Sequence, residues 1–374
     1  MSALFQPLQV GALSLKHRIV LAPLTRFRAD DNNVPLPMVK EYYQQRASTP
    51  GSLLITEGTF ISAQAGGFAN VPGIWNDAQI QAWRQITNAV HQNDSFIVCQ
   101  LWAIGRAAEP EILQRSSHTV LSASDISIGP EHATPQPMSE ADIQSFISDY
   151  ANAARNAIAA GFDGVEIHGA NGYLCDQFLQ DVSNKRTDQW GGSIENRARF
   201  GIEVAKAVAE AIGADRTGYR VSPWSPFQSM RMKDPVPQFS YLASKLRDLK
   251  LAYIHVVQSR ISGSETVEVP DESVDFLLDI WKGAGGATIL AGGFSPELAA
   301  ATAEKYSDVP VAVAFGRHYV ANPDLPFRVQ NAISLYPYNR ATFYTPKASV
   351  GYIDYSFSEQ YQVSQLQLVP GVRV

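Results

Sequence analysis

Residues 139–168, with the sequence SEADIQSFISDYANAARNAIAAGFDGVEIH, contain one helix followed by one strand, and this unit recurs along the chain. Ser139 and Asp142 form the S-x-x-D pattern that caps the start of a helix. Apolar residues then follow at helical spacing from Ile143 to Ile158, and Gly161 marks the end of the helix. The run Gly164–His168 is continuously apolar apart from Glu166 and its final histidine. It therefore predicts a strand that is buried on both faces, as in a parallel sheet.

Eight runs of this kind occur in the chain, and most are followed by a helical pattern. They are Ile19–Pro23, Leu53–Gly58, Phe96–Leu101, Gly164–His168, Gly218–Ser222, Tyr253–Val257, Thr288–Gly293 and Val311–Gly316. Eight strand–helix repeats indicate an α/β protein with a (β/α)8 TIM barrel. A doubly wound sheet is the alternative, but no G-x-G-x-x-G follows the first run. We expect one barrel domain over the 374 residues, because such barrels reach this length.

Several local features add detail to the barrel. Residues 7–15 alternate around Gly11, which predicts a hairpin that caps the bottom of the barrel. The polar, proline-bearing span 106–137 predicts a long lid or excursion after the third strand. Apolar stripes predict further helices within 80–90 and 200–212. Ser295 and Asn322 each precede a proline, as a capping residue does when proline is the first helical residue.

Composition limits the possible partners and compartments. The net charge is −6, and an acidic surface does not attract nucleic acid or an anionic membrane, whereas it leaves a small-molecule substrate open. Cys99 and Cys175 are too few for a disulfide framework or a cysteine-rich metal site, and we expect both to be free, buried thiols. Met1–Phe5 lacks the pattern of a signal peptide, and no apolar run has the length of a membrane span. These features favour a cytoplasmic protein.

In a TIM barrel the carboxyl ends of the strands form the active face. Here these ends supply Pro23-Leu24-Thr25, Glu57-Gly58, Gln100-Leu101-Trp102, His168-x-x-Asn171, Arg220, Gln258, Gly292-Gly293 and Gly316-Arg317. Glycines at strand ends are often only turn residues, but two such sites on neighbouring strands beside Arg317 favour a phosphate-bearing cofactor. His168 and His255 are not accompanied by an H-x-H pair or an aspartate cluster, so we expect no metal site. The sequence also has no G-x-S-x-G elbow for a nucleophilic serine.

The chain resembles the Old Yellow Enzymes, which are FMN-dependent ene-reductases, and among them the fungal members. The resemblance runs nearly end to end. It rests on A-P-L-T-R at 22–26, Q-L-W at 100–102, E-I-H-G-A-N-G-Y-L at 166–174, W-G-G-S-I-E-N-R at 190–197, A-G-G at 291–293, F-G-R at 315–317 and N-P-D-L at 322–325. The combination of H-x-x-N-x-Y with W-G-G-S-I-E-N-R is highly specific.

The resemblance implies a bound FMN that NADPH or NADH reduces in the same pocket. It assigns cofactor binding to Pro23, Leu24, Thr25, Gly58, Gln100, Arg220, Gly292, Gly293, Phe315, Gly316 and Arg317. Within this set, Gln100 would contact the pyrimidine edge of the flavin. Arg220 would lie beside N1 and O2, where negative charge gathers in the reduced flavin. The glycines and Arg317 would hold the phosphate.

The resemblance also implies the catalytic groups. His168 and Asn171 would bind the carbonyl oxygen of an α,β-unsaturated substrate, which is an enone or an enal, and Tyr173 would protonate its α-carbon. Taken singly, Asn171 could be only a turn residue and Tyr173 only a packing residue, but their joint spacing favours function. The substrate walls are expected to be Phe68, Trp102, Phe227 and Tyr344.

Some details leave the substrate open. Ala103, His318 and the segment 261–264 depart from the family pattern, which puts the substrate shape in question. The segments 34–37 (V-P-L-P) and 323–327 (P-D-L-P-F) resemble the fungal branch that acts on chanoclavine-I aldehyde, in which a tyrosine at position 173 goes with alkene reduction. The residues also allow a non-redox, phosphate-binding barrel enzyme or a flavin-holding protein without turnover. The oligomeric state is expected to be a monomer or a homodimer.

Overall fold

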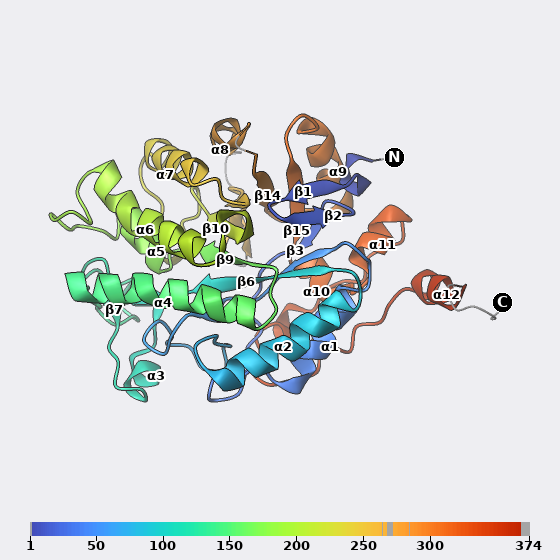
Figure 1. The fold of residues 1–374 in the computed structure, drawn as a ribbon, viewed down its shortest axis with the longest axis horizontal. Coiled ribbons are helices and arrows are strands. Elements are labelled where there is room, and N and C mark those ends of the chain that lie inside the picture. Colours follow the sequence, from blue (N-terminus) through green and yellow to red (C-terminus); the bar gives the residue numbers. More distant parts are fainter. Residues whose placement is uncertain (1, 264, 268–271, 284, 368–374) are drawn as a thin grey trace.

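The computed structural model describes residues 2–263, 265–267, 272–283 and 285–367. Eight parallel strands form a closed barrel with helices outside it (Figure 1), because β4 pairs with both β3 and β6 and so joins the two ends of the sheet. The barrel strands are β3 (Ile19–Leu21), β4 (Leu53–Ile55), β6 (Phe96–Trp102), β9 (Gly164–His168), β10 (Thr217–Val221), β11 (Tyr253–Val257), β14 (Ala287–Ala291) and β15 (Val311–Phe315). All eight predicted strands are confirmed.

The helices surround the barrel in chain order (Figure 1). They are α1 (Pro37–Arg46), α2 (Asp77–His91), α3 (Pro110–Gln114), α4 (Glu140–Ala159), α5 (Leu174–Leu179), α6 (Ile194–Ile212), α7 (Val236–Asp248), α8 (Asp275–Trp281), α9 (Pro296–Lys305), α10 (Arg317–Ala321), α11 (Leu325–Gln330) and α12 (Glu359–Gln367). Short 3-10 turns lie at Ala3–Phe5, Gly105–Ala107, Ala214–Arg216, Phe227–Ser229 and Arg340–Thr342. The helices predicted within 80–90, 143–158 and 200–212 are confirmed as α2, α4 and α6.

Capping chemistry explains where several helices begin. Ser139 and Asp142 form a reciprocal capping box at the start of α4, and the Ser295 side chain accepts a hydrogen bond from the Leu298 N–H at the start of α9. The predicted cap at Asn322 is wrong, because α11 begins at Leu325. The buried Asn322 side chain instead bonds the backbone of His318 and Tyr336, which occupies the groups that a cap would use.

The inner faces of the barrel strands form one cluster of buried apolar side chains. A separate cluster lies between the outer faces of the strands and the surrounding helices. The inner cluster includes Val20, Ile55 and Ile289 from the strands. Leu8 and Leu15, from the antiparallel hairpin of β1 (Leu8–Val10) and β2 (Leu13–Leu15), belong to the same cluster. The predicted hairpin is therefore present and closes one end of the barrel, which leaves the other end for a site.

The predicted excursion after β6 is also present. It contains α3, β7 (Leu121–Ser122) and β8 (Gln136–Pro137), with β7 and β8 paired. Its apolar residues, among them Leu113 and Val120, pack in one cluster with Phe60 and Trp102. Shorter paired strands follow β11, as β12 (Ile261–Ser262) and β13 (Glu265–Thr266), and β5 (Thr59–Phe60) extends the sheet beside β6.

Two expectations about the whole chain can be compared with the structure. Cys99 and Cys175 are both free and buried, as predicted. Among the described residues, no helix combines the length and the apolar character that crossing a membrane requires.

Candidate active site

A cavity of about 400 Å³ opens at the carboxyl ends of the barrel strands. Every residue predicted for catalysis or for the substrate walls lines it, as do all but one of the residues predicted for the cofactor. This set comprises Pro23, Leu24, Thr25, Gly58, Phe68, Gln100, Trp102, His168, Asn171, Tyr173, Arg220, Phe227, Gly292, Gly293, Gly316, Arg317 and Tyr344. The barrel thus brings together residues that lie up to 321 positions apart, from Pro23 to Tyr344.

Phe315 is the exception, because it does not line the cavity. Side chains alternate along a strand, and the neighbours Ala314 and Gly316 are the ones that face the cavity. The Phe315 ring packs in the outer core, with its centroid 6.4 Å from that of Phe294. Its side chain therefore lies in the core between barrel and helices, and the cofactor contact predicted for Phe315 stays a prediction.

Part of the cavity is formed by small side chains on neighbouring strands. Ala291 and Ala314 are register partners on β14 and β15, and Ala22 follows β3, which is the next strand of the barrel. All three line the cavity. Larger residues at inward-facing positions would fill the mouth of the barrel. These alanines leave a shallow apolar surface against which a flat ring system can lie.

Two buried polar side chains, Gln100 on β6 and Arg220 on β10, line the same cavity. The buried Nε of Arg220 has no hydrogen-bond partner among the described residues. A buried guanidinium normally binds an acceptor or an anion. The cavity therefore offers a cation and an amide to a polar ligand edge.

The glycines of β14 and β15 form another part of the cavity. Gly293 has φ +64°, and a Cβ built on it would lie 3.6 Å from Nη2 of Arg317. The Arg260 guanidinium donates to the Gly292 carbonyl at 2.9 and 3.1 Å. Because the peptide bond is trans, the Gly293 N–H points away from that carbonyl. Exposed backbone and a nearby cation suit a phosphate group.

These features fit FMN. The alanines accommodate a flat ring, Gln100 and Arg220 suit the polar edge of a pyrimidine, and the glycines with Arg317 suit a phosphate. The unpartnered Arg220 Nε supports an acceptor at that position. All the parts lie within one cavity, as a single extended cofactor requires.

His168 ends β9, and its tautomer follows from one hydrogen bond. The Ala170 N–H donates to its Nδ1 at 3.3 Å, so the ring proton is on Nε2. Burial, together with the charge of Arg220, lowers the pKa of His168 well below its ordinary value. The imidazole is therefore neutral and presents an N–H donor rather than a charge.

The turn after His168 is fixed by hydrogen bonds on several sides. Asn171 has φ +56°, and its N–H donates to Ser222 Oγ at 2.8 Å. The Gly172 N–H donates to Asp176 at 2.8 Å, and Gln177 donates to the Gly172 carbonyl at 2.7 Å. An asparagine tolerates this left-handed conformation better than most residues. These bonds hold Asn171 and the following tyrosine in one arrangement.

Tyr173 lies against two other rings of the site. Its centroid is 4.8 Å from that of Trp102 and 5.1 Å from that of His168, and both contacts are edge-to-face. Burial raises the pKa of Tyr173 above its ordinary value. The phenol therefore keeps its proton at neutral pH beside the His168 donor.

Several wall residues were not assigned to the walls from the sequence, although Ile261 and Gly263 lie in the segment 261–264 that was expected to affect substrate shape. Phe27, Ile261, Gly263 and Phe294 line the cavity, and Phe27 has φ +56°. No local pattern marks Phe27 as a wall residue, because an ordinary residue seldom adopts a left-handed conformation. Ile261 and Gly263 reach the cavity on the short β12–β13 ribbon.

The chain beyond the barrel adds Phe343 and Tyr344 to the wall. Arg26 donates to the Phe343 carbonyl at 3.0 Å and to the Gly351 carbonyl at 2.8 Å. Arg28 also donates to the Phe343 carbonyl, at 2.9 Å. Both arginines are fully buried and follow β3 closely. They hold the C-terminal segment against the first strand of the barrel.

The departures from the family pattern divide into two kinds. His318 lines the cavity, whereas Ala103 is fully buried in the outer core. Ala103 therefore does not line the cavity, and no direct contact supports its expected effect on substrate shape. Ile261 and Gly263 of the segment 261–264 line the cavity, and Ser264 lies outside the described residues.

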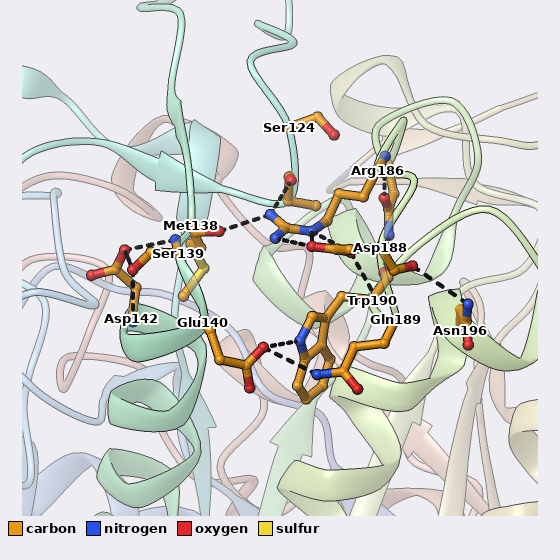
Figure 2. Close-up of polar contacts among 12 residues, drawn as sticks. Ser124, Met138, Ser139, Glu140, Asp142, Arg186, Asp188, Gln189, Trp190 and Asn196 are labelled. Atoms are coloured by element: carbon orange, nitrogen blue, oxygen red, sulfur yellow. Dashed lines mark hydrogen bonds and ion pairs between the residues drawn. The ribbon is translucent and has the colours of Figure 1, made fainter.

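The W-G-G-S-I-E-N-R motif at 190–197 contributes no residue to the cavity lining. Figure 2 shows that it lies in a polar cluster at the start of α4, where Trp190 donates to the Glu140 carboxylate at 2.6 Å. Arg186, just before the motif, donates to the carbonyls of Ala123 and Met138 at 3.0 and 2.8 Å. The motif and its neighbours therefore clamp the excursion after β6 to α4.

The barrel, the paired glycines and the donors around one cavity define a class, which is that of the flavin-dependent TIM-barrel oxidoreductases. The profile of the NADH:flavin oxidoreductase / NADH oxidase family matches residues 3–335. The chain belongs to this family. It is an oxidoreductase that binds FMN and uses NADH or NADPH as reductant. The non-redox alternative is thereby overturned.

Relatives and solved structures agree with this assignment. The chain is 56% identical to chanoclavine-I aldehyde reductase fgaOx3 of Penicillium roqueforti, over 97% of this chain and 98% of the relative. It is 49% identical to a probable inactive reductase, easA, of Epichloe festucae var. lolii, with 96% of both chains covered. The crystal structure of Old Yellow Enzyme from Pichia sp. AKU4542 matches with a TM-score of 0.89 at 38% identity, covering 96% of this chain and 94% of that one.

Proposed function

We propose that this enzyme reduces the C=C bond of α,β-unsaturated carbonyl compounds, with His168 and Asn171 as the carbonyl anchor and Tyr173 as the proton donor. The observation that carries the proposal is the contact between a neutral His168, with its proton on Nε2, and the protonated phenol of Tyr173. Two uncharged donors beside one cavity suit a carbonyl oxygen and a carbon that is to be protonated.

The anchor acts through differential stabilisation. The Nε2–H of His168 and the side-chain amide of Asn171 donate to the carbonyl oxygen, which polarises the conjugated alkene. Bound FMN supplies the hydride that the β-carbon receives. Negative charge then gathers on the oxygen, and preorganised donors stabilise it more strongly than they stabilise the ground state. The fixed turn at Asn171 supports this role, because hydrogen bonds of the Asn171 and Gly172 N–H groups hold the backbone that carries the Asn171 side chain.

Tyr173 completes the addition of hydrogen. Its O–H gives a proton to the α-carbon, so that one hydride and one proton are added across the alkene, and solvent restores the phenol proton. The raised pKa of Tyr173 keeps the proton available at neutral pH. Phe68, Trp102, Phe227 and Tyr344 would hold the apolar part of the substrate.

The proposed cofactor contacts follow the geometry of the cavity. Gln100 and Arg220 would hold the pyrimidine edge of FMN. The phosphate would be bound by Gly292, Gly293, Gly316 and Arg317, and the ring would be contacted by Pro23, Leu24, Thr25 and Gly58. NADPH or NADH would enter the same cavity before the alkene does.

Cinnamaldehyde distinguishes alkene reduction from reduction of the aldehyde itself. The purified enzyme, incubated anaerobically with NADPH and cinnamaldehyde, should give 3-phenylpropanal. Cinnamyl alcohol as the main product would show carbonyl reduction and contradict the assignment of Tyr173. If neither product forms, while FMN is bound and phenols still give charge-transfer colour, the result would support a flavin-holding protein without turnover. That outcome is worth testing because one relative is named a probable inactive reductase.

A second, narrower candidate is the reduction of chanoclavine-I aldehyde. It is favoured by the 56% identity to a protein named for that activity. The enzyme would then have a kcat/KM for this aldehyde that is higher than for cinnamaldehyde. A kcat/KM at or below that for cinnamaldehyde would favour a general ene-reductase.

We also propose that the protein is cytoplasmic, a single domain, and a monomer or homodimer. The two buried, unpaired cysteines suit a reducing compartment. Light scattering of the purified holoenzyme would give its oligomeric state, and a tagged protein located by microscopy would give its compartment.

A further inference from the structure

A buried carboxylate in the barrel interior contacts one of the residues that line the cavity. Glu166 on β9 is fully buried, and its Oε1 accepts a hydrogen bond from Gln100 Nε2 at 2.8 Å. Its Oε2 lies 2.8 Å from Nδ1 of His255, which is also fully buried. Gln100 and Glu166 are register partners on β6 and β9. A buried ion needs such partners, because leaving it unpaired is strongly destabilising.

The charge of Glu166 follows from its neighbours. Burial by itself would raise the pKa of Glu166, but His255, Arg220 and Gln100 together hold it below its ordinary value. Burial lowers the pKa of His255, which leaves that ring neutral with its Nδ1–H directed at the carboxylate. Glu166 is therefore ionised at neutral pH and can only accept hydrogen bonds.

An acceptor-only partner fixes the orientation of the Gln100 amide. The oxygen and nitrogen ends of a glutamine amide have nearly the same shape, so packing alone does not decide which one faces a ligand. Glu166 accepts only from the nitrogen. The Gln100 oxygen and the second N–H are then left for the cavity, as a donor–acceptor pair.

Arg220 is the second link between Glu166 and the cavity. It lies on β10, where it is the register partner of both His168 and His255. Arg220 is buried and lines the cavity. The negative charge of Glu166 attracts its guanidinium. The carboxylate therefore offsets part of the positive potential that Arg220 brings to the cavity.

We propose that Glu166, held by His255, is a positioning residue for FMN that selects the orientation of the Gln100 amide and moderates the charge of Arg220. The proposal rests on the proposed roles of Gln100 and Arg220 as cofactor ligands. It predicts that Glu166 sets both the affinity for FMN and the balance between oxidised and reduced cofactor.

Two substitutions separate the roles of orientation and charge. Glu166→Gln removes the charge and lets Gln100 turn, so FMN should bind about tenfold more weakly to the apoprotein. The remaining positive potential should favour reduced over oxidised FMN by about tenfold, or about 30 mV for two electrons. Glu166→Asp keeps the charge but is too short to reach Gln100 unaltered, so the affinity should fall while the potential stays close to that of the wild type.

The measurements are fluorescence titration of apoprotein with FMN and dye-equilibrated redox titration of the holoenzyme. Thr288→Val is a matched control, since it replaces another fully buried polar residue of the barrel wall and should change neither quantity. Unchanged affinity and potential in Glu166→Gln would overturn the proposal. Where that variant does not fold, an unchanged affinity in Glu166→Asp would overturn it in the same way, and a reduced affinity would support it.

A double-mutant cycle distinguishes positioning from general support of the fold. Gln100→Ala should weaken FMN binding, and adding Glu166→Gln should cause little further loss, because both act through one amide. Fully additive losses would show that Glu166 does not act through Gln100. Should Gln100→Ala bind FMN like the wild type, the assignment of Gln100 itself is wrong, which is a separate failure from that of Glu166.

Discussion

Replacing Tyr173 with phenylalanine tests the proposed chemistry most directly. The substitution removes one hydroxyl and leaves the ring in its contacts with Trp102 at 4.8 Å and His168 at 5.1 Å. The preceding turn is held by Asp176 and Gln177, which the substitution does not touch. We therefore expect FMN binding and the carbonyl anchor to survive in Tyr173→Phe.

The size of the effect follows from the role of a general acid. Such a group typically contributes 10²–10⁴-fold to a rate, or about 3–5 kcal/mol of transition-state stabilisation. Burial raises the pKa of Tyr173, so the phenol should not titrate between about pH 6 and 9. The deficit of the variant relative to the wild type should therefore be constant across this range.

Stopped-flow absorbance of the flavin separates the two half-reactions. Anaerobic reduction by NADPH should be within about twofold of the wild-type rate, whereas reoxidation by 2-cyclohexenone should fall by about 10²–10⁴-fold. Reoxidation by oxygen is the internal control, because it requires no proton at an α-carbon. An enone reoxidation rate within about threefold of wild type would refute Tyr173 as the donor, and loss of bound flavin would make it a structural residue.

Three further outcomes are expected. Arg317→Gln should weaken FMN binding by about 10–100-fold, since hydrogen bonds to charged groups contribute about 1.5–3 kcal/mol; an unchanged titration of the apoprotein would contradict the phosphate site. Gly58→Ala would place a Cβ 2.5 Å from Cε3 of Trp102, so the free energy of unfolding in urea should fall by about 1–3 kcal/mol, and no change would show that the indole can move freely. Burial raises the pKa of Glu57 from 4.5 to about 7, so the protonated carboxyl stabilises the fold fully below about pH 4.5, and this contribution is lost as the pH rises through 7. The stability of Glu57→Gln relative to wild type should therefore rise by about 3 kcal/mol between about pH 4.5 and 8, and a pH-independent difference would exclude this titration.

Local sequence was sufficient for the barrel and for much of its active face. A buried parallel strand needs a continuous apolar run, and a capped helix needs its cap at a fixed spacing, so each strand–helix unit can be recognised within about 30 residues. The carboxyl end of each strand then faces the site, which is why Gln100, His168 and Arg220 could be assigned before their contacts were known. Phe315 shows the limit of this reasoning, because the alternation along β15 turns its ring outward.

Specific motifs did not distinguish chemistry from support of the fold. The W-G-G-S-I-E-N-R motif helped to identify the family as strongly as the H-x-x-N-x-Y element did, yet the structure places it in a clamp between α4 and the excursion (Figure 2). A motif is specific when few other residues satisfy its contacts, and a structural clamp meets that condition as well as a catalytic group does.

The sequence by itself determined the TIM barrel, the family and the identity of the polar groups on the active face, because these depend on periodicity and on residues close together in the chain. Only the tertiary structure decided which walls enclose those groups and how they are held. Arg26 bonds the carbonyl of Phe343, 317 residues away, and the register of β6 with β9 places Gln100 on Glu166. Contacts of this kind depend on where the barrel closes, and no local pattern records that.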